Sequence, residues 1–467
     1  MRTQSLPSRA LWYGVALAAI VAATLLWHML QTEPLPFPTS WNLGLRAPID
    51  DFQSWVIGNR ANHPLFLYFF TPFKNWIETN LRTIEQFLLW LPWPVHFVLI
   101  YAVALQARGH GIALLSVGGL LLTALFGLWD ATMATFTLIF FSVLLSLLIG
   151  IPLGILAARF RALEATLRPL LDAMQTMPAF VYLIPVVLFF GLARTPSVVA
   201  TVIYALPPAI RLTILGIRQV DAHAIEAANA FGSTPWQRLR KVQLPLAMDS
   251  ILLGVNQTIM MALSIVVIAA LIGAGGLGQA VLTGLQRLRV GQALEAGLAI
   301  VLMAIVFDRI SSGFRRRRAR LQRAERQVWS IGALRSVPAR YRNILYWSGL
   351  LVLVLLLCFI KMQYGVMQSF PADWRFSIQG PVDGAVEWMR DNLYQIGDSP
   401  FGAGPLSDWI VINLLNPLRN LLLNLLPWPL AIATITLLAH QAGGRRTAIF
   451  SAVGLVLLGL LGMWPQS

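Results

Sequence analysis

The stretch Ile225–Ala247 reads IEAANAFGSTPWQRLRKVQLPLA and is polar, basic and helix-forming between two apolar neighbours. The chain around it is 57% hydrophobic and 12% charged, so a segment of this kind needs an explanation. Helix-favouring residues predict one short helix over Asp221–Phe231. Gly232 adopts a left-handed conformation readily, and we expect it to stop this helix.

A second short helix is expected directly after that glycine. Thr234 is a good N-cap, Pro235 suits the first helical position, and Gln237 is placed to complete a capping box. We expect this helix to run to Leu244 and to end at Pro245, because proline lacks an N–H and disfavours helix in the residue before it. The sequence therefore predicts two short helices at an angle, lying on a membrane surface.

The composition of the whole chain indicates a polytopic, all-α membrane protein. Apolar runs of about 20 residues recur, which is enough to cross a hydrocarbon core of about 30 Å. The formal charge of +15 is explained by basic residues gathering in cytoplasmic loops, so we expect no nucleic-acid partner. We place about eleven spans, near Leu11–Leu30, Phe87–Leu105, Ile112–Trp129, Thr132–Ala158, Ala179–Leu192, Ser197–Ile217, Ser250–Ile272, Ala293–Phe307, Ile344–Ile360, Leu418–Ala439 and Thr447–Met463.

Basic residues orient these spans consistently. With Arg2 and Arg9 in the cytoplasm, alternation places the other basic clusters on the same side, as the positive-inside rule requires. The N-terminus is then cytoplasmic, with the first apolar run as an uncleaved anchor, and the C-terminus is periplasmic. We expect membrane lipids to surround the chain. The run Arg315–Arg318 is interpreted first as fixing the topology and second as a site for anionic lipids. The cytoplasmic clusters are Arg108, Arg159/Arg161/Arg168, Ile225–Ala247, Arg315–Arg318 and Arg445/Arg446.

Residues that carry metal, redox or nucleotide chemistry are sparse. The six histidines show no HxxxH spacing, and Cys358 is the single cysteine, so we expect no metal site and no disulfide. GAGGLG at Gly273–Gly278 satisfies GxGxxG, but it follows a span and leads into no βαβ unit, so we expect a tight loop near a translocation path. The sequence contains no GxxxxGK[ST] phosphate loop. We therefore expect no enzyme activity and no bound cofactor.

Physical reasoning leaves two roles open for the quoted stretch. Small Ala227 and Ala228, beside the charge of Glu226, would fit closely into a groove on a soluble partner, while Leu239 and Val242 hold the other face to the protein. The alternative is an amphipathic surface helix. A DNA-reading helix-turn-helix is excluded, because the flanking spans would block access to a groove.

The segment EAANAFGSTPWQRLRKVQLP resembles the EAA loop of the membrane permeases of ABC importers. That loop has the pattern Glu-Ala-Ala, three residues, Gly, a spacer and Leu-Pro. The surrounding LLDAMQTMPAFVYLIPVVLFFG, ALPPAIRLTILGIRQV and IGAGGLGQ further resemble the glycine betaine/proline betaine and choline permease subfamily, over roughly residues 130–310. The residues that match the loop pattern are Glu226, Ala227, Ala228, Gly232, Leu244 and Pro245.

This resemblance implies the permease of an ATP-driven importer, with a type I ABC importer-like core. The six matching residues would couple the chain to a separate ATPase subunit that uses the ATP, and a periplasmic or lipid-anchored substrate-binding protein would deliver the solute. The implied substrate is a compatible osmolyte such as glycine betaine, proline betaine or choline, and the implied location is the bacterial cytoplasmic (inner) membrane. The alternatives are a secondary transporter or channel for a small amine, and an ABC permease for another small polar solute such as an amino acid.

Prolines and aromatic residues mark a candidate substrate path in the core. Proline breaks free backbone carbonyls that can line a water-filled cavity, and aromatic faces attract a trimethylammonium group. Simple kinking and packing are the alternative. Arg211 and Asp249 are interpreted as interfacial anchors. The candidates for the path are Pro178, Phe180, Tyr182, Pro185, Tyr204, Pro207 and Pro208.

One segment of the chain occurs twice. LPWPVHFVLIYAVALQARGHGIALLSVGGLLLTALFGLW from Leu91 returns without gaps as LPWPLAIATITLLAHQAGGRRTAIFSAVGLVLLGLLGMW from Leu426. Upstream, Phe37-Pro38 and Trp55 echo Phe370-Pro371 and Trp388. We therefore expect a duplicated three-span scaffold module around one transport core. The expected domains are residues 1–130 (first module), 131–315 (core, with the EAA loop at 221–247), 316–343 (basic cytoplasmic linker) and 344–467 (second module).

The repeat also bears on the pairing of permease cores. Ser467 corresponds through the repeat to Thr132, where the leading span of the core begins. We therefore expect a chain derived from a tandem permease, whose second core is lost or is a companion chain held by the second module. The alternative that stays open is a symmetric homodimer of this chain.

Overall fold

The structure is a computed structural model that describes residues 13, 15, 18–23, 26, 37–327, 339–365, 367, 369–394, 402–420 and 427–464, with the side chains of 315–345 left aside. The expected first span Leu11–Leu30, the middle of the basic linker 316–343, Leu426 and Ser467 lie wholly or mostly outside this description. Two compact units are present, one made of residues 56–386 and the other of residues up to 55 together with those from 387 onward. This division differs from the sequence segments proposed above, which stay a prediction.

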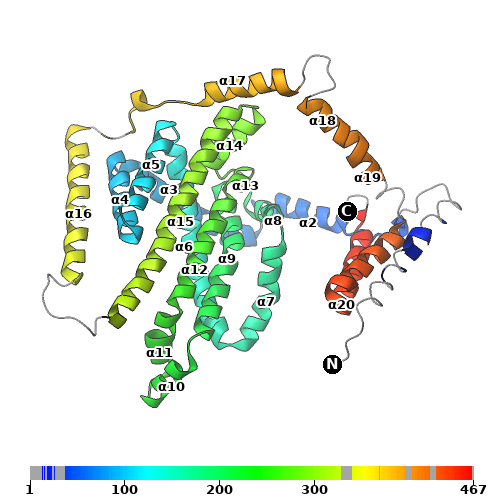
Figure 1. Cartoon of the computed structure of the whole chain (residues 1–467), viewed down its shortest axis with the longest axis horizontal. Helices are drawn as coiled ribbons and strands as arrows, with labels where there is room; N and C mark the ends of the chain where they lie inside the picture. Colours follow the sequence, from blue (N-terminus) through cyan, green and yellow to red (C-terminus); the bar gives the residue numbers. More distant parts are fainter. Residues whose placement is uncertain are drawn as a thin grey trace. The chain divides into compact units, whose positions relative to one another are not determined.

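Every regular secondary-structure element of the described residues is a helix (Figure 1). The short 3-10 turns are Thr39–Trp41 and Ala372–Trp374, and the π turns are Phe66–Phe70, Leu239–Gln243, Arg390–Tyr394 and Val411–Leu415. The α-helices are α2 (Arg46–Asn59), α3 (Thr71–Trp90), α4 (Trp93–Arg108), α5 (His110–Leu125), α6 (Trp129–Arg159), α7 (Arg161–Thr176), α8 (Ala179–Phe190), α9 (Arg194–Arg218), α10 (Ala222–Ala230), α11 (Pro235–Arg238), α12 (Leu244–Ser264), α13 (Val266–Ala270), α14 (Gly276–Gln286), α15 (Val290–Gln327), α16 (Ala339–Tyr364), α17 (Gln379–Met389), α18 (Ala403–Ile410), α19 (Asn416–Asn420) and α20 (Trp428–Leu460).

Four long helices, α6, α9, α12 and α15, form the centre of the larger unit. Lipid gives no hydrophobic driving force between helices, so close packing of small residues has to supply the contact. A Cβ on Gly154 of α6 would lie 2.6 Å from the Cβ of Thr213 on α9, and a Cβ on Gly254 of α12 would lie 3.2 Å from the Pro208 carbonyl oxygen. Glycine is therefore required where these helices cross.

Six helices of the described chain are long and apolar enough to span a membrane, and two bent helix pairs raise the number to eight. The expected span Phe87–Leu105 is not one straight helix, because the helical segments 66–90 and 93–108 meet at an angle of 101°. Leu91 is extended there, with φ −62° and ψ 141°, as the residue before a proline prefers to be. The expected span Ala179–Leu192 likewise follows α7 across a bend of 104°.

In the smaller unit, α20 (Trp428–Leu460) includes the second part of the expected span Leu418–Ala439 and most of the expected span Thr447–Met463. Its regular geometry is broken at Gly444, where φ is 77° and ψ is −167°. The repeat aligns Gly444 with Gly109, which joins α4 to α5 with φ 97° and ψ −173°. The two copies of the repeated segment therefore turn at the same glycine with the same backbone conformation.

Candidate coupling site

The first half of the site is α10, whose two ends follow from local hydrogen bonding. Asp221 is the N-cap, and its carboxylate accepts a bond from the His223 N–H at 3.0 Å. At the other end, the Ser233 N–H donates to the Ala228 carbonyl at 3.0 Å, and Gly232 has φ 69°. This is a Schellman termination, which needs a left-handed residue after the helix, so the predicted stop at Gly232 is confirmed.

The second half begins with the predicted capping box. The Gln237 N–H donates to Thr234 Oγ1 at 3.3 Å, and the Thr234 N–H donates to Gln237 Oε1 at 2.9 Å, with Pro235 at the first helical position. The predicted end at Pro245 is wrong. A π turn over residues 239–243 passes straight into α12, and Pro245 lies in the first turn of that helix.

The π turn explains how the helix continues past the proline. The Leu244 N–H donates to the Leu239 carbonyl, five residues back, so the turn is wider than an α turn. Pro245 then occupies a first-turn position, where a missing N–H costs little. Residues 235–264 accordingly count as one candidate span of 30 residues. The site is thus continuous with a core helix.

A side-chain bond fixes the angle between the two halves. Arg238 Nη1 donates to Asn229 Oδ1 at 2.8 Å, which joins the end of α11 to α10. Leu239 and Val242 are half-buried, consistent with holding this face to the protein. We call residues 221–245 the elbow. It has a defined shape before any partner binds.

The exposed side of the elbow differs in part from the expectation. Glu226 and Ala227 are exposed, with 75% of the Glu226 side chain accessible, whereas Ala228 is 7% exposed and packs mainly within the chain. Sequence reasoning missed two aromatic residues, Phe231 at 90% exposure and Trp236 at 64%. Large apolar side chains on an otherwise polar, basic segment were the available signal, because such residues anchor protein interfaces.

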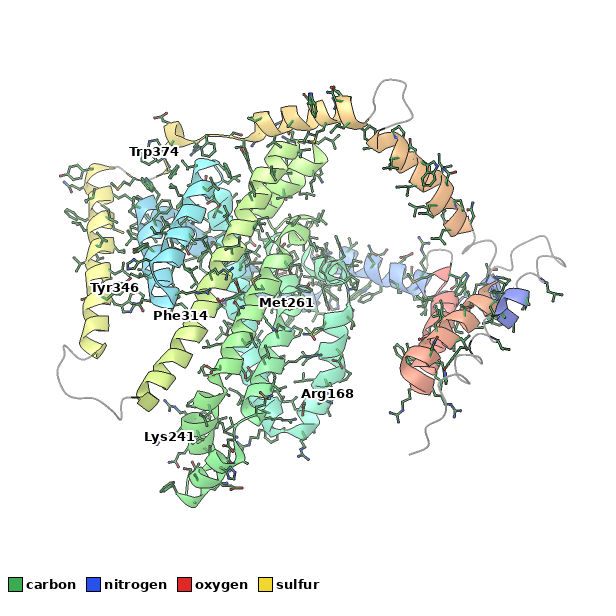
Figure 2. All side chains as sticks on the ribbon, viewed as in Figure 1. Arg168, Lys241, Met261, Phe314, Tyr346 and Trp374 are labelled. Carbon is green, nitrogen blue, oxygen red and sulfur yellow. The ribbon has the colours of Figure 1, made fainter. Side chains whose placement is uncertain are left out.

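Ion pairs join α7 to α9, the helix that leads into the elbow. Arg218 contacts Glu164 at 2.5 Å, and Arg168, which Figure 2 labels on α7, contacts the same carboxylate at 3.1 Å. Arg211, interpreted from sequence as an interfacial anchor, forms a further pair with Asp172 of α7. The end of α9 is thereby attached to a neighbouring helix at two points.

The residues proposed for the substrate path are only partly brought together. Tyr182 is buried and donates its hydroxyl to the Met174 carbonyl, and its ring centroid lies 6.2 Å from that of Tyr204 in a T-shaped contact. Phe180 is 54% exposed and lies outside this pair. The prolines occupy the bend before α8 (Pro178), the interior of α8 (Pro185) and the interior of α9 (Pro207 and Pro208).

A cavity of about 310 Å³ lies elsewhere in the larger unit, between α4, α5, α6 and α15. Its lining is mostly apolar, with Ser116 and Thr123 among the few polar groups, and it includes none of the proposed path residues. The substrate path therefore stays a prediction.

The GAGGLG segment is a tight loop, as expected, with positive φ at Gly273, Gly275 and Gly276. A Cβ on Gly276 would lie 2.3 Å from Thr135 Oγ1, and that same hydroxyl accepts a bond from the Leu277 N–H at 2.8 Å. These glycines allow α14 to begin directly against α6. The geometry gives them a packing role.

Taken together, the apolar helices that cross at glycine and the rigid elbow that continues into α12 define a membrane transport permease. Residues 150–320 match the family described as "Binding-protein-dependent transport system inner membrane component". The chain is 45% identical over 267 residues to the glycine betaine transport system permease protein OpuAB of Bacillus subtilis, covering 57% of this chain and 93% of that protein. It belongs to this family of inner-membrane, multi-pass permeases.

Two further relatives differ in how much of each chain is matched. The glycine betaine/proline betaine permease ProW of Escherichia coli is 49% identical over 235 residues, which are 50% of this chain and 66% of ProW. The trimethylamine N-oxide permease TmoV of Pelagibacter ubique is 32% identical over 398 residues. That match covers 84% of this chain but only 52% of TmoV, so the chain spans about half of that relative.

Proposed function

We propose that this chain is the membrane-spanning subunit of an ATP-driven importer for glycine betaine or a related methylated amine, proline betaine or choline. A separate ATPase subunit hydrolyses the ATP, and a substrate-binding protein delivers the solute from the periplasmic side. The elbow faces the cytoplasm in this arrangement, with the N-terminus on the same side.

The observation that carries the proposal is the elbow itself. Both helix ends are closed by their own hydrogen bonds, and the 2.8 Å contact between Arg238 and Asn229 fixes the angle between them. Phe231 and Trp236 are exposed on a segment that needs no such residues for its own folding. A preformed shape with exposed aromatic anchors is what a docking surface for a soluble subunit requires.

The connection from the elbow to the core supports a mechanical role. On one side α9 ends at Arg218, three residues before the elbow, and on the other side the elbow continues into α12 through the π turn. These two helices cross at Gly254, where α12 lies against the backbone of α9. A displacement of the elbow by a moving ATPase would therefore be transmitted to both helices as a pair.

The substrate class rests on the relatives. OpuAB and ProW are named for glycine betaine, and ProW also for proline betaine. TmoV, whose match covers more of this chain, is named for trimethylamine N-oxide, which makes that compound the second candidate. Glycine betaine, proline betaine and trimethylamine N-oxide each carry a fully substituted cationic nitrogen and a negatively charged oxygen. A cation of this kind suits aromatic faces such as those of Tyr182 and Tyr204.

Reconstitution tests the proposal. The chain is placed in proteoliposomes with its ATPase and binding protein, and uptake of radiolabelled glycine betaine, choline, trimethylamine N-oxide and glutamate is measured. We expect uptake of a methylated amine only when ATP is hydrolysed. Uptake by the chain alone under a sodium or proton gradient would establish a secondary transporter, and uptake of glutamate alone would overturn the substrate class.

A further inference from the structure

The two copies of the repeated segment exchange the segments that precede them. We call Phe37–Arg46 the first strap and Phe370–Gln379 the second strap. From here on, the first module means α4–α5 alone and the second module means α20 alone, without the straps that precede them. Phe370 is 1% exposed, and its ring centroid lies 5.3 Å from that of Trp93 and 6.4 Å from that of Trp129. The second strap therefore packs on the first module.

The first strap packs in the same way on the second module. Phe37 is 7% exposed, and its ring centroid lies 4.9 Å from that of Trp428 and 5.7 Å from that of Trp464. The repeat aligns these two tryptophans with Trp93 and Trp129. Each strap thus inserts its phenylalanine between the same two tryptophans of the other copy.

Backbone and side-chain bonds repeat the exchange. The Phe376 N–H donates to the Leu125 carbonyl at 2.9 Å, and the Leu43 N–H donates to the Leu460 carbonyl, the aligned position, at 2.8 Å. Upstream, Tyr346 of α16 donates to the Ala102 carbonyl of α4 at 3.2 Å (Figure 2), while the aligned Tyr13 Oη lies 2.7 Å from His440 Nδ1 of α20.

The first module and its strap carry a transport core. A Cβ on Gly119 of α5 would contact Val306 and Leu302 of α15 at 3.6 and 3.7 Å. At the end of α15, the fully buried carboxylate of Glu295 accepts bonds from Ser377 Oγ at 2.8 Å and Gln379 Nε2 at 2.7 Å, both in the second strap. The core is thus held by α5 and by the strap.

Within the smaller unit, no core helix covers the corresponding surface of α20, which we call the seat. Gly454 aligns with Gly119, yet no atom of this unit's described residues lies within 4 Å of a Cβ built there. Ile435 and Leu438, aligned with residues that line the α4–α15 cavity, are 44% and 51% exposed. In the first strap, Arg46 aligns with Gln379; its side chain is 94% exposed and contacts only the exposed Asp50 carboxylate, at 3.6 Å, among the ion pairs of the described residues. The second strap thus has Gln379, whose amide donates to the buried Glu295, and the first strap has Arg46 at the aligned position.

We propose that the second module and the first strap form the docking surface for a second permease core of this family, one that has no three-span module of its own. The last helix of that core would lie on Gly454, and an acidic residue equivalent to Glu295 would pair with Arg46. A second copy of this chain does not fit, because its α15 is already covered by its own α4 and α5. The inference rests on the proposed function only in that the occupant is a permease core.

Site-specific photo-cross-linking tests this surface in membranes of the native host. p-Benzoylphenylalanine replaces Leu438 in the full-length chain, because Leu438 is 51% exposed and aligns with Val103, which lines the cavity between α4 and α15, so the probe leaves Gly454 open to the docking helix. The cross-linked product is identified by sequencing its peptides. The matched control carries the probe at Val453, which is 53% exposed and aligns with Gly118, where no described atom lies within 4 Å of an added Cβ. We expect at least tenfold more product at position 438, containing peptides of a permease core that differ from residues 129–327.

Two further variants keep the test decisive. Gly454→Leu fills the seat and is expected to lower co-purification of the second core at least tenfold, whereas Val453→Leu leaves it unchanged. Arg46→Glu is expected to lower cross-linking from position 438. Peptides from residues 129–327 of a second copy, or lipid adducts alone, would overturn the inference. ATP-dependent uptake in the same membranes is scored separately, so a failed importer and a failed docking surface give different results.

Discussion

Replacing Gly232 by valine isolates the contribution of the elbow's shape. Gly232 has φ 69°, and no described atom lies within 4 Å of a Cβ built on it, so the substitution creates no steric clash with the rest of the chain. The whole effect is then the cost of a left-handed conformation, about 1–2 kcal/mol for an ordinary residue and more for a β-branched one. Asparagine tolerates this conformation, so Gly232→Asn is the matched control.

The cost appears where the elbow docks. If the ATPase binds only the correctly terminated elbow, 1–2 kcal/mol lowers its apparent affinity by roughly fivefold to thirtyfold. We expect Gly232→Val to weaken ATPase binding by this factor, measured with the chain in nanodiscs, and to lower betaine uptake in proteoliposomes at limiting ATPase. Gly232→Asn should stay within about twofold of the wild type. Equal ATPase affinity and uptake for all three chains would refute the argument that this turn shapes the docking surface.

Three further predictions concern charge and packing. Glu226→Lys reverses an exposed charge and is expected to weaken ATPase binding without changing membrane insertion, checked by pull-down and by protease mapping; unchanged binding would exclude Glu226 from the interface. Arg211→Met and Asp172→Asn should show a coupling energy of at most about 1 kcal/mol in a double-mutant cycle of unfolding, because both groups are more than a third exposed, and a larger value would contradict this. Gly154→Leu should destabilise the α6–α9 crossing by about 1–3 kcal/mol or more, seen as a lower melting temperature, whereas Gly118→Leu should not; equal melting would argue against glycine packing.

Local signals in the sequence were sufficient to predict most of the elbow. The N-cap at Thr234, the capping box with Gln237 and the stop at Gly232 depend on residues within a few positions of one another, so one sequence contains the needed information. Pro245 was predicted wrongly because the rule for proline assumes an α turn before it. The π turn over residues 239–243 changes which backbone N–H groups are required, and no residue type marks that change.

Contacts between distant segments could not be predicted in the same way. The repeat identified Phe37 and Phe370 as equivalent residues, but equivalence does not say which module either one contacts. Both choices bury the same apolar surface against the same pair of tryptophans, so composition and periodicity cannot separate them. Glu295 is a similar case: it falls in an expected span, and only the position of Ser377 and Gln379 explains why a buried carboxylate is tolerated there.

The exchange of straps also orders events during synthesis. The tryptophans of the first module are complete once residue 129 has been made, but Phe370 leaves the ribosome about 240 residues later, roughly 10–50 s at ordinary elongation rates. The contact of Phe37 in the first strap with Trp464 forms later still, because Trp464 is synthesised after Phe370. During that interval the transport core enters the bilayer while its scaffold is open to other aromatic partners. A slowed ribosome between residues 129 and 370 would therefore lengthen the interval in which the tryptophans of the first module lack Phe370 as their partner.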